Sequence, residues 1–175
     1  MNREEFDHVV RAAADVVGDD IVVIGSQAIL AQHPDAPEEM LRSAELDVFP
    51  RTKLGAADEI DGALGDGSPF HETFGYYAHS VGPETLTAPA GWENRLIRVE
   101  LRAAQRKQGT VVAWCLATHD LVVAKLAAGR EHDLEFVRAA IASGLVDTEQ
   151  LRLGIDLLPE TERAAARERL AALSD

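Results

Sequence analysis

The spacing of apolar and polar residues changes along the chain from a helical period to a strand period and back. Between residues 3 and 17, apolar side chains recur every three or four positions, as in an amphipathic helix. The face that this helix would bury carries Phe6, Val9, Val10, Ala13, Val16 and Val17. Gly18-Asp19-Asp20 follows and is typical of a helix end. We therefore expect a helix over residues 3–17 that leads directly into a strand.

Short apolar or alternating runs that are bounded by turn residues predict β-strands. The first run covers residues 21–24 and the second covers residues 45–49, with a polar loop at 33–43 between them. A weaker helical period follows at 54–64. The remaining predicted strands cover residues 73–81, 95–101 and 110–116.

After residue 116 the pattern is helical to the last residues. Thr118 is a suitable N-cap for the first helix of this part. The later helices are expected at about 131–143, from 147 onward, and from Pro159 to the end. This order predicts an α+β fold, with a mixed β-sheet flanked by helices in residues 1–117. Residues 118–175 would form a C-terminal helical segment packed on that core, as one compact unit.

The candidate chemistry lies around the first two strands. Glu45 and Asp47 are two positions apart on a strand, so they point to the same face. Two close carboxylates repel each other unless a cation lies between them, and Mg²⁺ prefers oxygen ligands. Gly25-Ser26 forms a turn after the first strand, where backbone amides and a helix N-terminus can hold phosphate. The alternatives are an ordinary capped turn and two solvated acids on an edge strand.

In this order, the elements resemble the nucleotidyltransferase superfamily, which has the polymerase-β-like fold. Its motif is an apolar strand, Gly-Ser, a helix, and then acid-x-acid on the next strand. Gly25-Ser26 and the pair Glu45 and Asp47 stand at those places. The first acid is Glu rather than the usual Asp, and the spacer before it is longer than usual. The resemblance implies a nucleotidyltransferase-like mixed β-sheet with a C-terminal helical extension.

A second stretch resembles the small bacterial members that occur as toxins or antitoxins in toxin–antitoxin pairs. These carry an apolar helix with a lysine, followed by arginine and aspartate, and here the residues are Lys125, Arg130 and Asp133. The resemblance places Lys125 toward the nucleotide phosphates, although a lone lysine on an apolar helix can also extend into solvent. Asp133 would support the site or take part in catalysis, and Arg130 would pair with it at i, i+3. Glu100 is the best candidate for the third carboxylate of the family.

The resemblance implies a Mg²⁺-dependent enzyme that transfers a nucleoside monophosphate from a nucleoside triphosphate to an acceptor. The expected site residues are Gly25, Ser26 and Lys125 for the nucleotide, Glu45, Asp47 and Glu100 for the metal, and Glu45, Asp47, Lys125 and Asp133 for catalysis. The acceptor stays open among a tRNA end, a protein side chain and a small molecule. The alternative is a catalytically degenerate protein of the same fold that binds a cognate toxin or antitoxin.

Charge qualifies the choice of acceptor. The 175 residues carry a formal net charge of −13, and an acidic surface repels nucleic acid. A tRNA acceptor is therefore possible but not favoured. One stretch is locally basic, and it would meet a triphosphate or form a solvated face; its cations are Arg95, Arg98, Arg102, Arg106, Lys107, Lys125 and Arg130.

The remaining features argue for an ordinary soluble core. The single cysteine, Cys115, lies in an apolar run and is expected to be buried. No run has the length of a membrane span, and the charged N-terminus lacks an apolar signal core, so a cytoplasmic location is expected. Trp92 is expected to anchor a loop to the core. The histidines without ligand spacing, expected to be structural or exposed, are His71, His79, His119 and His132.

Overall fold

The computed structural model describes residues 1–103 and 109–174. Its strands are β1 (Ile21–Val23), β2 (Glu45–Pro50), β3 (Tyr77–Ser80), β4 (Ile97–Arg102) and β5 (Thr110–Cys115). Its α-helices are α1 (Arg3–Val17), α2 (Ala57–Leu64), α3 (Pro69–Phe74), α4 (Thr118–Ala128), α5 (Glu131–Ala142), α6 (Thr148–Ile155) and α7 (Glu160–Ser174). Short 3₁₀-helices are η1 (Ser26–Ala31), η2 (Glu38–Met40), η3 (Leu54–Ala56), η4 (Pro83–Thr85) and η5 (Trp92–Asn94).

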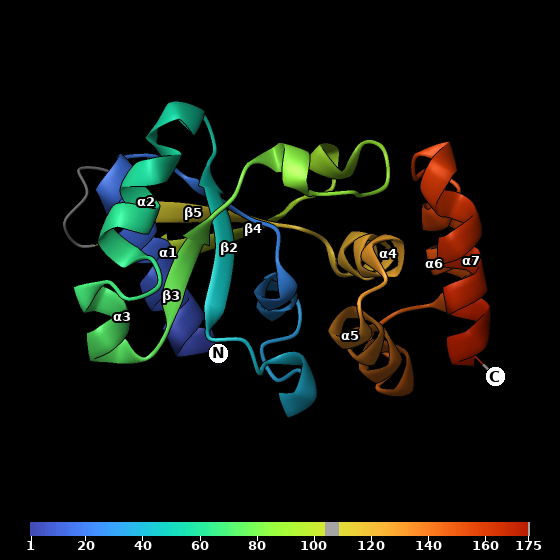
Figure 1. Ribbon diagram of the computed structural model, residues 1–175. Helices are drawn as coiled ribbons and strands as arrows, with labels where there is room; N and C mark the ends of the chain where they lie inside the picture. The colour runs from blue at the N-terminus through green and yellow to red at the C-terminus, as the bar shows by residue number, and fades with distance from the viewer. Residues whose placement is uncertain (104–108, 175) are drawn as a thin grey trace.

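The strands form one mixed sheet in the order β3-β2-β1-β5-β4 (Figure 1). β1 is antiparallel to β2 and parallel to β5, β3 is parallel to β2, and β4 is antiparallel to β5. The predicted α+β class is therefore confirmed. β1 and β2, which carry the predicted motif, lie beside each other near the middle of the sheet.

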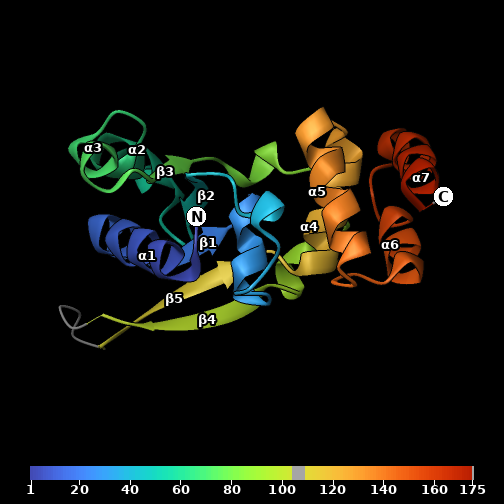
Figure 2. The same cartoon turned by 90° about the horizontal axis from the view of Figure 1, so that it is seen from below.

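One face of the sheet is buried under α1 and α2 (Figure 2). On β2 and β3, the alternate residues Leu46, Val48 and Ala78 point to this side and are fully buried. They belong to the same core as Phe6 and Val9 of α1. Because strand side chains alternate between faces, the intervening residues of β2 and β3 must point to the opposite face.

The opposite face is only partly covered. Val22, Ile24 and Phe49 form a small buried cluster, which the connection between β3 and β4 crosses. Leu86 and Trp92 of that connection pack against the cluster, so the predicted anchoring role of Trp92 is confirmed. The part of β2 before this cluster carries the two acids and lines a cleft.

The predicted first helix is confirmed, and both of its ends are capped. The Asn2 side chain accepts a hydrogen bond from the Glu5 N–H at 3.0 Å, and the Glu5 carboxylate accepts one from the Asn2 N–H at 2.8 Å. This reciprocal pair is a capping box. Gly18 ends the helix in the left-handed conformation, with φ 63°, which glycine adopts without steric cost.

The third strand is shorter than predicted. Its expected start lies in α3, where Ser68 accepts a hydrogen bond from the His71 N–H at 3.1 Å and caps the helix. Gly75 ends α3 with φ 78°, so the strand begins only at Tyr77. The alternating apolar pattern from Thr73 onward reflects one short helical turn followed by a strand.

Helix α4 begins one residue earlier than predicted, because Ala117 rather than Thr118 is its N-cap. The N–H and the hydroxyl of Thr118 instead donate to the side-chain oxygen of Gln32, at 2.8 Å and 3.0 Å. Gln32 directly follows η1, so one amide side chain joins the turn after β1 to the first residue of α4. This contact places α4 opposite the carboxyl end of β1.

The C-terminal helices pack as a group around α4, which contacts α5, α6 and α7 (Figure 1). Arg169 of α7 donates to the Leu126 and Ala127 carbonyl oxygens at 2.6 Å and 2.8 Å. These carbonyls belong to the last turn of α4, so the arginine satisfies acceptors that the helix cannot. The predicted boundary at residue 117 falls between β5 and α4, and the division into two parts stays a prediction. In the part of the chain that the structure describes, no helix combines the length and apolar content needed to cross a lipid bilayer.

Candidate active site

A cleft of about 720 Å³ lies between the open end of β2 and the helices α4 and α5. Its walls come from the turn after β1, from β2 and β3, and from the facing sides of the two helices. These segments are far apart in the sequence, and η1 and η2 lie between them in space (Figures 1 and 2). All but one of the predicted site residues line this cleft; they are Gly25, Ser26, Glu45, Asp47, Lys125 and Asp133.

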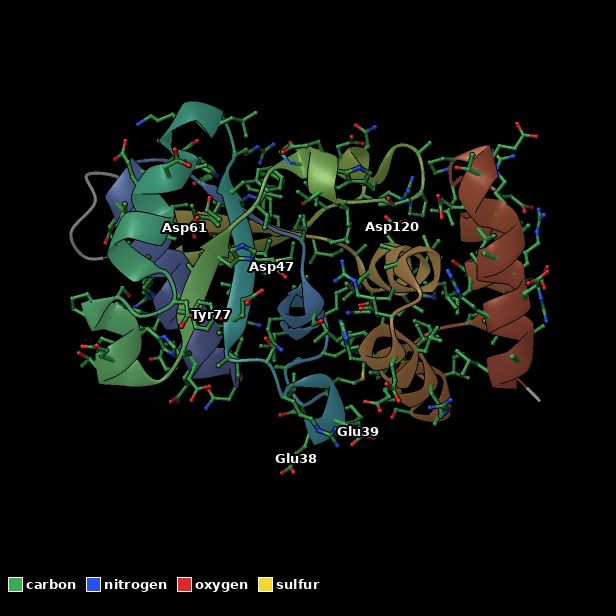
Figure 3. All side chains as sticks on the ribbon, viewed as in Figure 1. Glu38, Glu39, Asp47, Asp61, Tyr77 and Asp120 are labelled. Carbon is green, nitrogen blue, oxygen red and sulfur yellow. The ribbon has the colours of Figure 1, made fainter. Side chains whose placement is uncertain are left out.

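The parallel pairing of β2 with β3 brings four polar side chains to one face. Glu45 lies opposite Tyr77, and Asp47 lies opposite His79. The Tyr77 hydroxyl donates to Oε2 of Glu45 at 2.7 Å. Nδ1 of His79 lies 3.2 Å from Oδ1 of Asp47 and 3.3 Å from Oε1 of Glu45. Figure 3 shows Asp47 on β2 and Tyr77 on the adjacent β3.

The two acids have different environments. Burial, together with the neighbouring Glu45 carboxylate, raises the pKa of Asp47 to about 6. Burial is the largest influence on Glu45 and acts to raise its pKa, but the hydrogen bonds with Tyr77, Asp47 and His79 and the charge of His79 together outweigh it, so the pKa of Glu45 is lowered. The hydrogen bond to Glu45 raises the pKa of Tyr77 to about 12. Burial acts to lower the pKa of His79, but the two carboxylates raise it overall.

Gly25 allows the turn after β1 to approach the acids closely. A Cβ at this position would lie 1.8 Å from Oδ2 of Asp47, so no other residue fits without moving that carboxylate. The Ile24 N–H donates to the Asp47 carbonyl at 3.1 Å, which fixes the two segments side by side. Ser26 begins the short helix that was expected here, and it is a 3₁₀-helix of 6 residues, η1. Its first N–H groups have no acceptor within the helix, and Gly25 and Ser26 line the cleft.

Lys125 lies across the cleft from the acids. Its ammonium donates to Oδ1 of Asp133 at 2.8 Å, and the two side chains are only 9% and 6% exposed. The ammonium also lies 4.7 Å from the centre of the Phe136 ring. The second oxygen of Asp133 is buried without a hydrogen-bond partner among the described residues. The predicted pairing of Asp133 with Arg130 is therefore wrong, because Asp133 pairs with Lys125 instead.

Glu100 is not part of this site, so its assignment as a metal ligand is wrong. It lies on β4, three strands from β2 in the sheet order, which corresponds to about 14 Å across the sheet. Its carboxylate pairs with Arg98 on the same strand, and its side chain is 54% exposed. Glu100 therefore does not provide the third carboxylate that was expected beside Glu45 and Asp47.

The third polar side chain beside the two acids is that of His79, which sequence reasoning missed. Glu45, Asp47 and His79 each offer a ligand atom, and these atoms lie within 4.8 Å of one another. His79 was expected to be structural or exposed because it has no ligand spacing with another histidine. Asp47, the nearer of the two acids in the sequence, is 32 residues away, so the pairing of β3 with β2 is what brings His79 to the acids.

The locally basic stretch does not form a single surface. Arg95 bonds to Asp120 at the start of α4, and Arg98 pairs along its own strand. Arg106 and Lys107 lie outside the described residues. Of the described cations in this stretch, those that line the cleft are Lys125 and Arg130. Among the described cations of this stretch, those that a phosphate in the cleft would meet lie on the side of α4 and α5.

Cys115 is buried and free, as predicted, and burial raises the pKa of its thiol to about 12. It is therefore a core residue rather than a nucleophile.

Comparison with known families gives one finding that agrees with this geometry. The family model described as "Nucleotidyltransferase of unknown function (DUF6036)" matches residues 4–168. Comparison with curated proteins and with solved structures gives no match. The family match covers the sheet, the cleft and most of the C-terminal helices. The chain therefore belongs to this nucleotidyltransferase family.

Proposed function

We propose that the protein transfers a nucleoside monophosphate from a nucleoside triphosphate to an acceptor hydroxyl, with a divalent cation such as Mg²⁺. One observation carries this proposal. Glu45 and Asp47 converge on one face of β2 against Gly25, and Lys125 lies across the same cleft. In this arrangement, the two carboxylates can bind a divalent metal ion and the Gly25 turn lets a phosphate approach that ion closely. The ammonium of Lys125 can then offset the negative charge of the phosphate.

The residues present fit a divalent cation. Two carboxylates and an imidazole nitrogen lie within 4.8 Å of one another, and oxygen-rich sets of this kind hold divalent ions. Glu45 and Asp47 would hold the ion, and His79 lies beside them. When bound, a divalent cation would stabilise negative charge on the attacking and leaving oxygens.

The other residues of the cleft bind and orient the nucleotide. An ammonium has three donors, so Lys125 can keep its bond to Asp133 and still donate to a phosphate oxygen. Asp133 is thus a positioning residue, since it holds the ammonium at the wall of the cleft. Arg130 is exposed at the same wall and would meet the outer phosphates. Tyr77 fixes the orientation of Glu45 through their hydrogen bond.

In the reaction, the acceptor oxygen forms a bond to the α-phosphorus while the bond from that phosphorus to the bridging oxygen breaks. Pyrophosphate leaves, and the hydroxyl proton passes to solvent. Positioning and electrostatic stabilisation carry most of the rate in such transfers. The acceptor, and a partner from a toxin–antitoxin pair, stay predictions that rest on the resemblance.

The test is the substitution Asp47→Asn, which keeps the shape of the side chain and removes the charge that would hold the cation. With Mg²⁺, a nucleoside triphosphate and a panel of tRNA, protein and aminoglycoside acceptors, pyrophosphate release should fall at least ~100-fold. The matched control is Asp58→Asn, the same change on the exposed surface of α2, which should leave the rate unchanged.

Thermal stability separates a catalytic role from a structural one. Because the pKa of Asp47 is raised in the folded protein, its ionised form is disfavoured by folding, and Asn should leave the melting temperature equal or slightly higher. A mutant that melts well below wild type would show that Asp47 is needed for the fold. If wild type binds no nucleotide with Mg²⁺, the degenerate partner-binding protein is the better assignment.

A further inference from the structure

His79 faces the two acids from the neighbouring strand. The parallel register places it directly opposite Asp47, and adjacent residues on paired strands point to the same face. Its Nδ1 atom lies 3.2 Å from Oδ1 of Asp47 and 3.3 Å from Oε1 of Glu45. The imidazole nitrogen therefore bridges the two carboxylate oxygens, at the centre of the face where the cation is expected.

These separations fit neighbouring ligands of a six-coordinate ion. In an octahedral site with bonds of about 2.2 Å, adjacent ligand atoms are about 3.1 Å apart, because the edge is the bond length multiplied by √2. Both contacts of Nδ1 are close to this value. The Glu45 carboxylate is also held in place independently of the ion, because Tyr77 donates to its other oxygen at 2.7 Å. A hydrogen-bonded ligand of this kind is typical of metal sites.

The nature of the third donor decides which ion the site prefers. Mg²⁺ is usually held by carboxylates, phosphates and water, whereas imidazole is a good ligand for first-row transition ions. Mn²⁺ accepts both carboxylate oxygen and imidazole nitrogen in octahedral geometry and binds least tightly in its series. A site with two carboxylates and one imidazole can therefore hold either ion, and it matches Mn²⁺ better than Mg²⁺.

We propose that His79 is a metal ligand of the cleft, and that its nitrogen gives the site a preference for Mn²⁺ over Mg²⁺. This inference rests on the proposed function for the presence of a cation at the acids. It adds a ligand and an ion preference that the acid pair alone does not give. The side chain of His79 is 50% exposed and lines the cleft, so phosphate oxygens and water could reach an ion held there and complete its shell.

The competing role for His79 is that of a simple counter-ion. A protonated imidazole between two carboxylates would stabilise the acids in the absence of metal and would compete with any cation for them. The two roles predict opposite changes in Mn²⁺ affinity when His79 is removed. Removing a ligand weakens Mn²⁺ binding, whereas removing a competing positive charge strengthens it.

The experiment is a titration of the whole protein with Mn²⁺, in which electron paramagnetic resonance measures the concentration of free Mn²⁺. A second titration with added Mg²⁺ measures the affinity for Mg²⁺ by competition. Wild type should bind Mn²⁺ at least ~10-fold more tightly than Mg²⁺. His79→Ala should weaken Mn²⁺ binding at least ~10-fold and change Mg²⁺ binding less than ~3-fold. His79→Gln, which offers an amide oxygen in place of nitrogen, should lose the preference while keeping Mg²⁺.

A spectroscopic signature identifies the ligand without any enzymatic activity. Bound Mn²⁺ in wild type should show hyperfine coupling to an imidazole nitrogen in electron spin echo experiments, and His79→Ala should abolish it. The control is His132→Ala, which removes the other histidine among the described residues that line the cleft. Coupling should persist in that variant. Circular dichroism and the melting temperature check that each variant is folded.

Three results would overturn the inference. They are unchanged or tighter Mn²⁺ binding in His79→Ala, nitrogen coupling that survives this substitution, and a wild type that prefers Mg²⁺. Failure of the proposed function looks different. A protein that binds Mn²⁺ through His79 but binds no nucleoside triphosphate would keep this inference and refute nucleotidyl transfer.

Discussion

The buried pair Lys125 and Asp133 gives a prediction whose size follows from the structure. The two groups are 2.8 Å apart, with side chains that are 9% and 6% exposed. Removing one partner of such a pair leaves a buried charge without compensation, which costs about 3–5 kcal/mol. Lys125→Met would leave the carboxylate of Asp133 buried without its ion-pair partner, and one oxygen of that carboxylate already lacks a hydrogen-bond partner among the described residues. Asp133→Asn would leave the ammonium of Lys125 buried beside the Phe136 ring without its carboxylate partner.

The double variant separates the free-energy cost of an unpaired buried charge from the other effects of each substitution on stability. Lys125→Met with Asp133→Asn removes both charges, so it should be more stable than either single variant, with a coupling energy of about 3 kcal/mol. Urea unfolding followed by circular dichroism measures these values. Each single variant should also melt roughly 6–20 °C below wild type, at about 2–4 °C per kcal/mol for a chain of this size. Because the pair lines the cleft, water can reach it, and we expect the loss of stability and of melting temperature to lie at the lower end of these ranges.

A functional measurement completes this cycle. If Lys125 also meets phosphate, the double variant should be folded and yet bind a fluorescent nucleoside triphosphate roughly 10–100-fold more weakly, because one charge-assisted hydrogen bond is lost. Two results would refute the reasoning. Additive single effects, within about 0.5 kcal/mol, would show that the groups do not interact. Unchanged nucleotide affinity would leave Lys125 with a structural role alone.

Two further predictions concern the turns beside β1. Gly25→Ala should displace the Asp47 carboxylate and weaken nucleotide binding at least ~10-fold, whereas Gly62→Ala, where a Cβ meets nothing within 4 Å, should not; equal affinities would contradict the close approach. Asp19 accepts hydrogen bonds from the Thr52–Lys53 turn, which outweigh its burial and lower its pKa. The stabilisation that Asp19 gives the fold should be fully present above the pKa of Asp19 in the unfolded chain. It should be lost as the pH falls through the lower pKa that Asp19 has in the folded protein. Asp19→Ala should therefore cost about 1 kcal/mol near neutral pH, and this difference should shrink below pH ~4 in urea unfolding; a constant difference would refute it.

Much of the fold could be predicted because its signals are local. The helical period of residues 3–17 and the alternation in β2 are set by neighbours within a few positions, and the structure places both elements as expected. The shared face of Glu45 and Asp47 follows from strand geometry alone. The errors also had local causes. Thr73 to Tyr76 alternate like a strand, but Ser68 and Gly75 cap a single helical turn there.

The site could be predicted only as far as each half is encoded in one continuous segment. The Gly-Ser turn and the acid pair form one half, and the α4 lysine forms the other. What joins them is non-local. The Gln32 side chain ties η1 to the start of α4, and Arg169 holds the last turn of α4 against α7. No spacing in the sequence signals either contact, because the partners are 86 and 43 residues apart.

The third donor shows why this limit matters for function. A search for a third acid leads to Glu100, which has the right charge and a strand context but lies at the wrong edge of the sheet. The strand order decides the matter, since β3 rather than β4 lies beside β2. Whichever residue stands opposite Asp47 on β3 completes the face, and in this chain it is His79. The identity of that one residue, and with it the expected choice of cation, depends on strand order and register rather than on any motif.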